Sequence, residues 1–434
     1  MATETLPSQW RARVPMPVPG VVLYAPGSPK SQVLFAFARE LRARGWRTRG
    51  VVVDTLYNNA GQKSGLDLID IANDSRLPLS RPDTKGITIG RWVLDPAVLA
   101  EGDARIRQAV AEGADFIVVD KFGPLESGSG GFMCGLRAAL GSNVPLLVAL
   151  RGEFLGGWDG FAGLQSVMVR PDMASLWRWW GPYRLYEELA RGVADEPARR
   201  VLVGINWTLV EGPLGCGLAH SPARDAPGCR PLADPGRFAG QSLRMLAQLA
   251  TSWNPFEAGI GIAAINAHYN RRDLVGASAN GLDLFAETTG RKFVIGRFPE
   301  LSTRIPAAIV LERVPGPGDL PAHAADWVLP EADAIAITSS ALGNLTLPHL
   351  LDLRRDARVA LVGPGTPLTG RLHAYGVTWL SGFIVEDAGR AASIVAEGGA
   401  TKALKACGRR VTLVAAGEAG DTASATIAGH FGMQ

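Results

Sequence analysis

Cysteine is scarce in this sequence. The 434 residues include four cysteines, Cys134, Cys216, Cys229 and Cys407, and no two of them form a C-x-x-C pair. Small secreted domains that depend on disulfides are much richer in cysteine, so a reduced protein is the simplest interpretation. We therefore predict a cytoplasmic location.

Long apolar runs are missing as well. A membrane-spanning helix needs roughly 18 or more apolar residues in a row, and every apolar run here is interrupted before that length. Residues 1–19 contain no apolar core of the length found in signal peptides, so we interpret them as a flexible leader. No membrane span is expected.

The sequence also lacks a large excess of positive or negative charge. The chain has 44 Lys and Arg against 41 Asp and Glu, a net charge of +3, and its basic clusters are short, such as residues 42–49. Proteins that bind nucleic acid need a basic patch or stripe, because phosphate contacts dominate their affinity. The cluster of Trp177, Trp179 and Trp180 therefore indicates packing or an interface instead of base stacking, and no nucleic-acid partner is expected.

What the sequence does contain is a regular alternation of apolar strands and amphipathic helices. The segment 20–25 reads as a strand, 32–44 as a helix that ends at Gly45, and 51–53 as a second strand. Further apolar strands are expected at 114–120, 144–150, 201–210, 291–296, 307–312, 334–340, 359–362, 378–383 and 411–414. This pattern predicts an α/β protein with parallel sheets, and the length requires more than one hydrophobic core.

The turn after the first strand resembles a damaged phosphate-binding loop. A working loop reads G-x-x-x-x-G-K-[ST]: its glycines let backbone N–H groups wrap a phosphate, and its Lys and hydroxyl serve phosphate and Mg²⁺. Lys30 and Ser31 occupy the last two positions, but Tyr24 and Pro29 stand where the glycines belong. Because proline lacks an N–H group, the loop argues against the usual mode of nucleotide binding.

An acid follows the strand at 114–120. An aspartate such as Asp120, at the carboxyl end of a parallel strand, can hold Mg²⁺ through water, and Glu126 could polarise a water molecule. The alternative is that Asp120 caps a turn, as strand-end aspartates commonly do. On the first interpretation Lys30, Ser31, Asp120 and Glu126 form a site for nucleotide and Mg²⁺.

Three segments of the first third are similar to an uncharacterised bacterial family related to P-loop nucleoside triphosphatases. They are LDLIDIANDSRLPLSR, IVVDKFGPLESGSGG and VPLLVALRGEFLGGWDGFAG. The resemblance covers about residues 20–165, and its most specific element is the block from Asp120 to Glu126. It implies a link to molybdenum transport.

A possible soft-metal site lies in the middle of the chain. Cys216, His220 and Cys229 are separated by four and nine residues, whereas a structural zinc site needs four ligands in closely spaced pairs. Cys216 and His220 remain candidate ligands of a thiolate–imidazole site. The alternative is that they are small buried or turn residues.

Polar residues and glycines follow several strands of the last third. In a parallel sheet these strand ends line one crevice, where Glu312, Thr338, Ser340 and the loop 363–367 would surround a polar ligand. Such residues are also good turn formers, which is the alternative. The loop contains two prolines and no G-x-G-x-x-G, so it is not a dinucleotide loop, but N–H groups at a helix start would suit an oxyanion.

Three later segments are similar to a two-domain family named for heavy-metal chelation. They are GIGIAAINAHYN, DAIAITSSALGNLTL and VALVGPGTPLTGRLHAYGVTWLSGFIVED, within about residues 180–415. The resemblance implies a small domain like the enolase N-terminal domain, then a Rossmann-like domain, with a ligand site between them. Strand ends and resemblance together assign the ligand to Asn266, Glu312, Thr338, Ser340, Asn344, Thr346, Gly363, Gly365 and Thr366.

These observations predict four segments: the leader 1–19, a degenerate P-loop-like domain 20–165, a linker and enolase-N-terminal-like α+β domain 166–278, and a Rossmann-like domain 279–434. The expected function is binding or handling of a metal species, as molybdate, another oxyanion or a transition metal. Expected partners are a small-molecule or metal ligand, proteins of metal transport or metalloenzyme maturation, and further copies of this chain.

Two enzymatic alternatives stay open. One is ATP or GTP hydrolysis with Mg²⁺ by the N-terminal domain. The other is a reaction on a small organic substrate in the cleft between the last two domains. No Ser/His/Asp order in the sequence identifies a nucleophile, so no catalytic residue is assigned.

Overall fold

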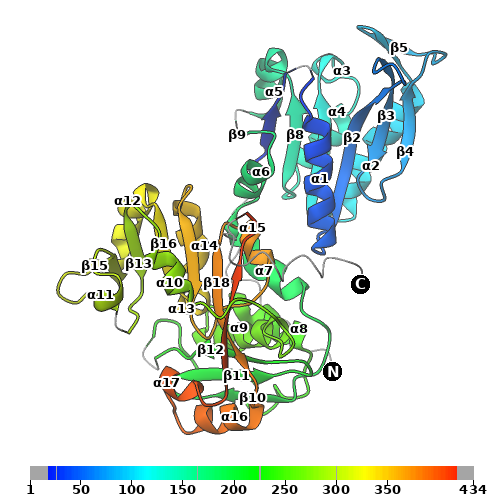
Figure 1. Cartoon of the computed structure of the whole chain (residues 1–434). Coiled ribbons are helices and arrows are strands. Elements are labelled where there is room, and N and C mark those ends of the chain that lie inside the picture. The colour runs from blue at the N-terminus through cyan, green and yellow to red at the C-terminus, as the bar shows by residue number, and fades with distance from the viewer. Residues whose placement is uncertain (1–17, 26, 164, 224–225, 300, 418–434) are drawn as a thin grey trace. The chain divides into compact units, whose positions relative to one another are not determined.

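The computed structural model describes residues 18–25, 27–163, 165–223, 226–299 and 301–417 (Figure 1). Within this part the chain forms two compact units, which divide after Trp180. Each unit has its own sheets and its own hydrophobic core. The predicted leader lies outside the described residues except for its last two positions, and so does the end of the last predicted domain, 418–434.

The N-terminal unit is built on a seven-stranded sheet in the order β4-β3-β2-β7-β8-β1-β9. Strands β2, β7, β8, β1 and β9 run parallel, and β3 and β4 are added antiparallel beyond β2. The strands are β1 (Gly20–Leu23), β2 (Thr48–Tyr57), β3 (Lys63–Asp70), β4 (Arg76–Ser80), β7 (Phe116–Phe122), β8 (Leu146–Leu150) and β9 (Val167–Val169), with a separate hairpin of β5 (Ile87–Ile89) and β6 (Trp92–Leu94).

Helices cover this sheet because their apolar residues recur at helical spacing. In α1, Leu34, Phe37 and Leu41 are fully buried, and burying each such side chain contributes roughly 2 kcal/mol. Gly45 follows α1 at φ 94°, the left-handed conformation expected after a helix. The helices are α1 (Lys30–Ala43), α2 (Pro96–Ala111), α3 (Pro124–Ser127), α4 (Met133–Leu140), α5 (Leu155–Ala162) and α6 (Met173–Trp180).

The tryptophan cluster belongs to the N-terminal unit, so the boundary predicted at residue 165 lies too early. Strand β9 pairs with β1, and α6 packs Trp177 and Trp180 edge-on against Phe37, with ring centroids 5.5 and 6.5 Å apart. These rings are almost completely buried. Their burial extends the unit to Trp180, and at least these two tryptophans have the packing role that the sequence favoured.

The second unit begins with a small antiparallel sheet, β10 (Arg200–Val203), β11 (Trp207–Glu211) and β12 (Cys216–His220). The single strand expected over 201–210 is therefore two strands joined by a tight turn. Helices α8 (Leu243–Ala247) and α9 (Pro255–Tyr269) lie on one side of this sheet, and α16 (Ala388–Ala396) and α17 (Thr401–Leu404) on the other (Figure 1). Strand β12 approaches α9 so closely that a Cβ on Gly217 would lie 2.0 Å from the Ala263 carbonyl oxygen.

The second unit continues into a Rossmann-like layer of seven strands, in the order β15-β14-β13-β16-β17-β18-β19. All neighbours are parallel except β18 and β19. The strands are β13 (Lys292–Ile295), β14 (Ile309–Glu312), β15 (Leu320–Pro321), β16 (Ala334–Thr338), β17 (Arg358–Val362), β18 (Trp379–Val385) and β19 (Gly408–Val414). The helices are α10 (Gly281–Ala286), α11 (Leu301–Arg304), α12 (Ala325–Val328), α13 (Ser340–Gly343), α14 (Leu347–Leu353) and α15 (Arg371–Ala374). The predicted α/β fold class is confirmed.

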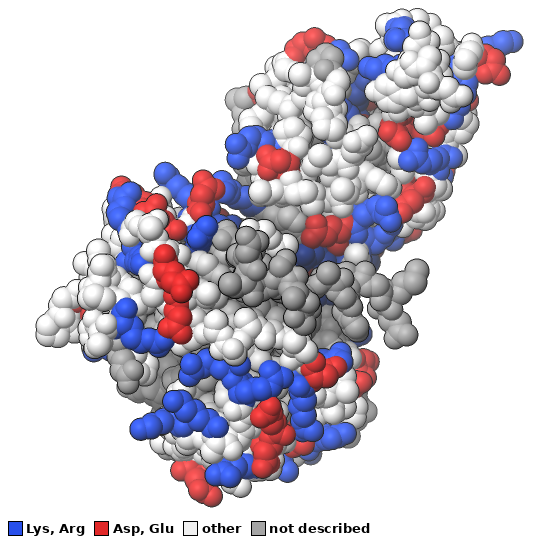
Figure 2. Space-filling model, in the orientation of Figure 1, with Lys and Arg blue, Asp and Glu red and all other residues white. Residues whose placement is uncertain are grey.

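The surface agrees with the small net charge. Acidic and basic side chains are interspersed on the face shown in Figure 2, on both units. Within the described residues, no helix combines the length and the apolarity needed to cross a bilayer.

Candidate functional site

The predicted strand ends of the Rossmann-like layer lie at one edge of its sheet. The chain runs from β13 to β14 and β15 on one side, then returns to β16 on the other, so the direction of strand order switches between β13 and β16. Glu312 ends β14, Thr338 ends β16 and Gly363 follows β17, and β13 lies between β14 and β16 in this parallel part of the sheet. Open α/β sheets bind ligands outside the carboxyl ends of their strands at such a switch point.

The loop after β17 is a buried joint, not the open anion cradle that the sequence suggested. Asn266 on α9 donates to the Leu218 and Gly365 carbonyls at 2.7 and 2.9 Å. Asn270, one turn later, donates to the Thr366 carbonyl at 3.0 Å and accepts from the Leu368 N–H at 2.8 Å.

Two of the loop's three N–H groups donate to carbonyls of the protein itself. Gly363 and Thr366 donate their N–H groups to the carbonyls of Ser381 and Gly363, both at 3.0 Å, and the loop's two prolines have none. Asn266, Asn270 and Thr366 are 0% exposed. Four of the predicted ligand residues therefore hold α9 against the Rossmann-like layer: Asn266, Gly363, Gly365 and Thr366.

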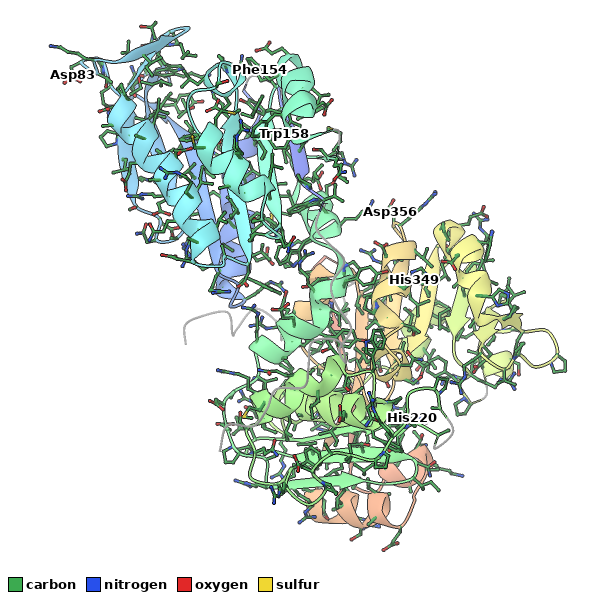
Figure 3. The ribbon with its side chains drawn as sticks, turned by 180° about the vertical axis from the view of Figure 1, so that it is seen from behind. Asp83, Phe154, Trp158, His220, His349 and Asp356 are labelled. Carbon is green, nitrogen blue, oxygen red and sulfur yellow. The ribbon has the colours of Figure 1, made fainter. Side chains whose placement is uncertain are left out.

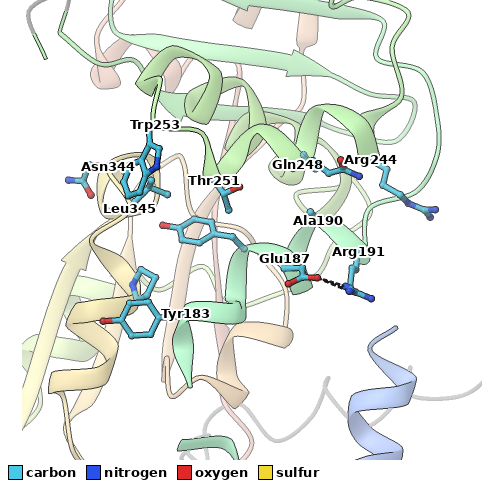
Figure 4. Close-up of a pocket in the computed structure, with 13 residues that line it drawn as sticks. Tyr183, Glu187, Ala190, Arg191, Arg244, Gln248, Thr251, Trp253, Asn344 and Leu345 are labelled. Atoms are coloured by element: carbon cyan, nitrogen blue, oxygen red, sulfur yellow. Dashed lines mark hydrogen bonds and ion pairs between the residues drawn. The ribbon is translucent and has the colours of Figure 1, made fainter. Parts of the chain in front are cut away.

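An open pocket of about 710 Å³ lies elsewhere in the second unit (Figure 4). It is formed by α7 (Leu185–Arg191), by α8 with the turn of 3₁₀ helix that follows it (Gln248–Thr251), and by the connection from α13 to α14. Trp253 and Asn344 lie at one end, and Arg191 and Arg244 at the other. The residues that line it are Tyr183, Tyr186, Glu187, Ala190, Arg191, Arg244, Ala247, Gln248, Thr251, Trp253, Asn344, Leu345 and Pro348.

Several pocket residues are fixed by contacts within the unit. The Tyr186 hydroxyl donates to the Leu342 carbonyl at 2.8 Å, which attaches α7 to α13. Glu187 and Arg191, one helical turn apart, form an ion pair at 2.6 Å. The Arg244 Nε donates to the Val193 carbonyl at 2.8 Å, its one hydrogen bond within the described chain. These contacts fix part of the pocket wall, which carries guanidinium, amide, hydroxyl and aromatic groups.

The sequence located one residue of this pocket, Asn344. Its side-chain oxygen accepts from the N–H and hydroxyl of Thr346, at 3.1 and 2.7 Å, and both residues are exposed. Thr338 and Ser340, whose hydroxyls are 3.4 Å apart, lie one short helix before it. No pattern in the sequence indicated that the helices carrying the other lining residues face each other.

Cys216 and His220 do not form the predicted metal site. They stand at opposite ends of β12, paired with Glu211 and Trp207 respectively, and four residues of extended strand span roughly 13 Å. Cys216 is 0% exposed in the core, and His220 ends β12 of the small sheet, away from the labelled His349 (Figure 3). Within the described residues, no three His, Cys, Asp or Glu side chains gather where they could hold a metal ion.

Cys216 is expected to be inert toward a thiol reagent such as DTNB in the folded protein, while the exposed Cys134 reacts. Burial raises the pKa of the Cys216 thiol to about 12, so its thiolate population near pH 8 falls roughly a thousandfold. Mass spectrometry of labelled peptides measures both sites, and equal labelling rates would contradict the prediction. Because the folded pKa is raised, this thiol's contribution to stability is present below about pH 8.5 and lost as pH rises toward 12.

In the N-terminal unit, the structure brings together three of the four predicted nucleotide-site residues. Lys30 forms a buried ion pair with Asp120, and Ser31 donates its hydroxyl to the other Asp120 oxygen at 2.6 Å. Lys30 also donates to the Ser31 hydroxyl at 2.8 Å. Strand β8 lies between β1 and β7, so the contact spans two strand positions along the sheet edge.

Tyr24 and Pro29, which stand at the two glycine positions of a phosphate-binding loop, lie beside this cluster. The Lys30 ammonium lies over the Tyr24 ring, 4.4 Å from its centroid, and burial raises the pKa of the Tyr24 hydroxyl to about 12. Pro29 caps α1 without a side-chain hydrogen bond. Pro26 lies outside the described residues.

Glu126, the fourth predicted residue, clamps a loop. Its two carboxylate oxygens accept the N–H groups of Gly123 at 2.9 Å and Phe132 at 3.1 Å, and burial raises the pKa of this carboxyl. Gly131, at φ 59°, passes so close that a Cβ there would lie 2.0 Å from the carboxylate. The loop is wrapped around the acid, which leaves it poorly placed to polarise a water molecule.

Comparison with known proteins divides the chain in the same way. The DUF2478 model, described as a protein of unknown function, matches residues 20–179. Residues 186–269 match the DUF4213 model and residues 280–414 the DUF364 model, both described as "Putative heavy-metal chelation".

Individual relatives follow the same division. The chain is 26% identical over 159 residues to the molybdenum import ATP-binding protein ModC 2 of Bradyrhizobium diazoefficiens, a match to 37% of this chain and 18% of the relative's length. It is 30% identical over 149 residues to the nucleoside-triphosphatase THEP1 of Methanothermobacter thermautotrophicus, covering 34% of this chain and 79% of the relative. A DUF364-family structure from Desulfitobacterium hafniense is 33% identical, covers 54% of this chain and 98% of its own, and superposes with a TM-score of 0.49.

The unit boundary and the sequence matches divide the chain into the same two parts. The match to THEP1 covers most of that relative, and the two chelation models together follow the second unit from α7 to β19. The chain therefore belongs to the heavy-metal chelation family over residues 186–414, fused to a DUF2478 segment related to nucleoside triphosphatases over residues 20–179.

Proposed function

We propose that the second unit binds a metal oxyanion of the molybdate type in the pocket between α7, α8 and the α13–α14 connection. The observation that carries this proposal is the composition of the pocket wall. Arg191, Arg244, Gln248, Thr251 and Asn344 offer hydrogen-bond donors to an anion, and oxyanions are bound by such donors. Segments of both chelation-family matches contribute to the wall.

The missing ligand cluster favours an oxyanion over a free metal cation. A divalent transition metal needs several His, Cys, Asp or Glu ligands around one point, and the described residues contain no such group. A metal bound by the described part of the chain would therefore bring its own oxygen or organic ligands. A pocket of about 710 Å³ also exceeds the needs of a small tetrahedral anion, which leaves room for an organic part of the ligand.

The proposal is tested by calorimetric titration of the full-length protein with molybdate, tungstate, sulfate and divalent metal chlorides. Molybdate and tungstate should bind, and Arg244→Gln should weaken them about tenfold, the loss of one charge-assisted hydrogen bond. Arg237→Gln is the matched control, because it removes an exposed arginine of the same segment outside the pocket. Divalent cations binding more tightly than either oxyanion, or an unchanged Arg244→Gln, would contradict the proposal.

A second candidate function is nucleotide binding by the N-terminal unit. It is supported by the convergence of Lys30, Ser31 and Asp120 and by the likeness to two nucleotide-related proteins. A protein that binds both an oxyanion and a nucleotide would act in the cytoplasm, beside proteins of molybdenum transport or metalloenzyme maturation. Titration with ATP tests the second candidate separately, because the two sites lie in different units.

A further inference from the structure

Three basic side chains gather at the carboxyl edge of the N-terminal sheet. Lys30 begins α1 shortly after β1, Lys121 follows Asp120 on β7, and Arg151 is the first residue after β8. The parallel pairings of β8 with β1 and β7 bring these strand ends to one edge. Burial lowers the pKa of the Lys121 ammonium, and the charges of Lys30 and Arg151 lower it further.

Lys30 is already neutralised within the protein. Its ammonium contacts Asp120 and the Ser31 hydroxyl, and the Tyr24 ring covers it. The three N–H groups of the Lys30 ammonium thus have Asp120, Ser31 and the Tyr24 ring as partners. An incoming anion would have to compete with Asp120 for this lysine. Lys30 therefore does not supply the free positive charge of this edge.

Lys121 and Arg151 supply that charge. Lys121 makes no hydrogen bond or ion pair among the described residues, although its side chain borders a small cavity of about 50 Å³ with apolar walls. Arg151 interacts with the Tyr24 hydroxyl and lies 3.5 Å from Glu153, with both charged side chains largely open to solvent. A half-buried ammonium without a partner favours the arrival of an anion.

The loop before α1 offers fewer backbone donors than a glycine loop does. Glycine loops hold phosphate with successive N–H groups, but Pro29 has none and the Ser28 N–H donates to the Ala25 carbonyl at 3.1 Å. Anion binding at this edge therefore draws more on side chains, and Lys121 and Arg151 are cations placed to provide it.

We propose that Lys121 and Arg151 bind the phosphate groups of a nucleotide at this edge, and that the unit holds the nucleotide without hydrolysing it. The proposal rests on the second candidate function, nucleotide binding. Hydrolysis needs Mg²⁺ beside the phosphates and a group that orients water. Both Asp120 oxygens are engaged by Lys30 and Ser31, and both Glu126 oxygens accept backbone N–H groups.

The binding half is tested by titrating the full-length protein with ATP, tripolyphosphate and adenosine, each with Mg²⁺. ATP should bind, tripolyphosphate more weakly and adenosine not at all, while Lys121→Met and Arg151→Gln should each weaken ATP about tenfold or more. Arg170→Gln, at an arginine 80% exposed in the same unit, should leave binding unchanged. Tripolyphosphate binding as tightly as ATP would overturn the assignment to a nucleotide.

Further outcomes separate this proposal from the function on which it rests. If ATP binds wild type and both variants equally, nucleotide binding stands and the role of Lys121 and Arg151 falls. If ATP does not bind at all, both fail. Lys121→Met should also raise the thermal midpoint, because it removes a half-buried ammonium without a partner, so its weaker binding would not result from unfolding.

The second half of the proposal is tested by phosphate release. Release from ATP with Mg²⁺ should be no faster with the protein than without it. Release that depends on the protein and disappears in Asp120→Asn would overturn the claim that the nucleotide is held intact.

Discussion

The variant Asp120→Ala is expected to destabilise the N-terminal unit by roughly 3–5 kcal/mol. Asp120 is 0% exposed, and Lys30 beside it is 7% exposed. Removing the carboxylate leaves the Lys30 ammonium buried without its counter-charge and takes the hydrogen-bond acceptor from Ser31. A loss of this size is a large fraction of the stability of an ordinary domain.

Hydrogen exchange with mass spectrometry locates this loss in the full-length protein, because peptides from β7 and α1 report the N-terminal unit alone. The informative companion is the double variant Lys30→Met with Asp120→Leu, which replaces the pair by apolar side chains. Such replacements of buried pairs are often neutral or stabilising, so the double variant should recover most of the protection. If the double variant were as unstable as Asp120→Ala, the loss of stability would come from the changed side-chain shape and not from the unpaired charge.

The variant Asn270→Ala is expected to cost the second unit roughly 3–5 kcal/mol, from the unsatisfied groups that it leaves. Its amide donates to the Thr366 carbonyl at 3.0 Å and the Phe383 carbonyl at 3.3 Å, and its oxygen accepts from the Leu368 N–H at 2.8 Å. All three backbone groups lose their Asn270 partner in a site where the asparagine is 0% exposed.

The loss should appear as faster exchange in peptides that contain α9 and the loop 363–368, with β1 and α1 unchanged. Asn344→Ala is the matched control, because it removes an exposed asparagine of the same unit whose hydrogen bonds are local to one turn. It should cost less than about 1 kcal/mol. Equal losses in the two variants would mean that Asn270 does not hold the loop.

Much of the fold follows from local patterns in the chain. Leu34, Phe37 and Leu41 recur at the spacing of one helix face, and all three are buried against the sheet. Apolar runs such as 359–362 are short and uninterrupted, which is typical of strands buried on both faces in a parallel sheet. Turns at 204–206 were missed because the residues on both sides of that turn are apolar, and a continuous run hides a hairpin.

Of the two candidate sites, the N-terminal cluster could be predicted from the sequence and the large pocket could not. The phosphate-loop spacing and the strand-end acid were sufficient to pair Lys30 and Ser31 with Asp120, because the carboxyl ends of parallel strands share an edge. No comparable rule links α7 to α8, since helices on different parts of a fold can face in many directions. The large pocket was therefore out of reach, apart from Asn344.

The sequence by itself determined the α/β class, most strands, and the residue types available to each site. Only the tertiary structure decided which of them meet. It separated Cys216 from His220, because an extended strand holds residues four apart at its two ends. It also turned Asn266 and the glycine loop inward, because buried backbone carbonyls need donors and the asparagines of α9 provide them. Local periodicity depends on residues close together in the sequence. The hydrogen bonds from Asn266 to Gly365 and from Asn270 to Thr366 join positions about a hundred residues apart.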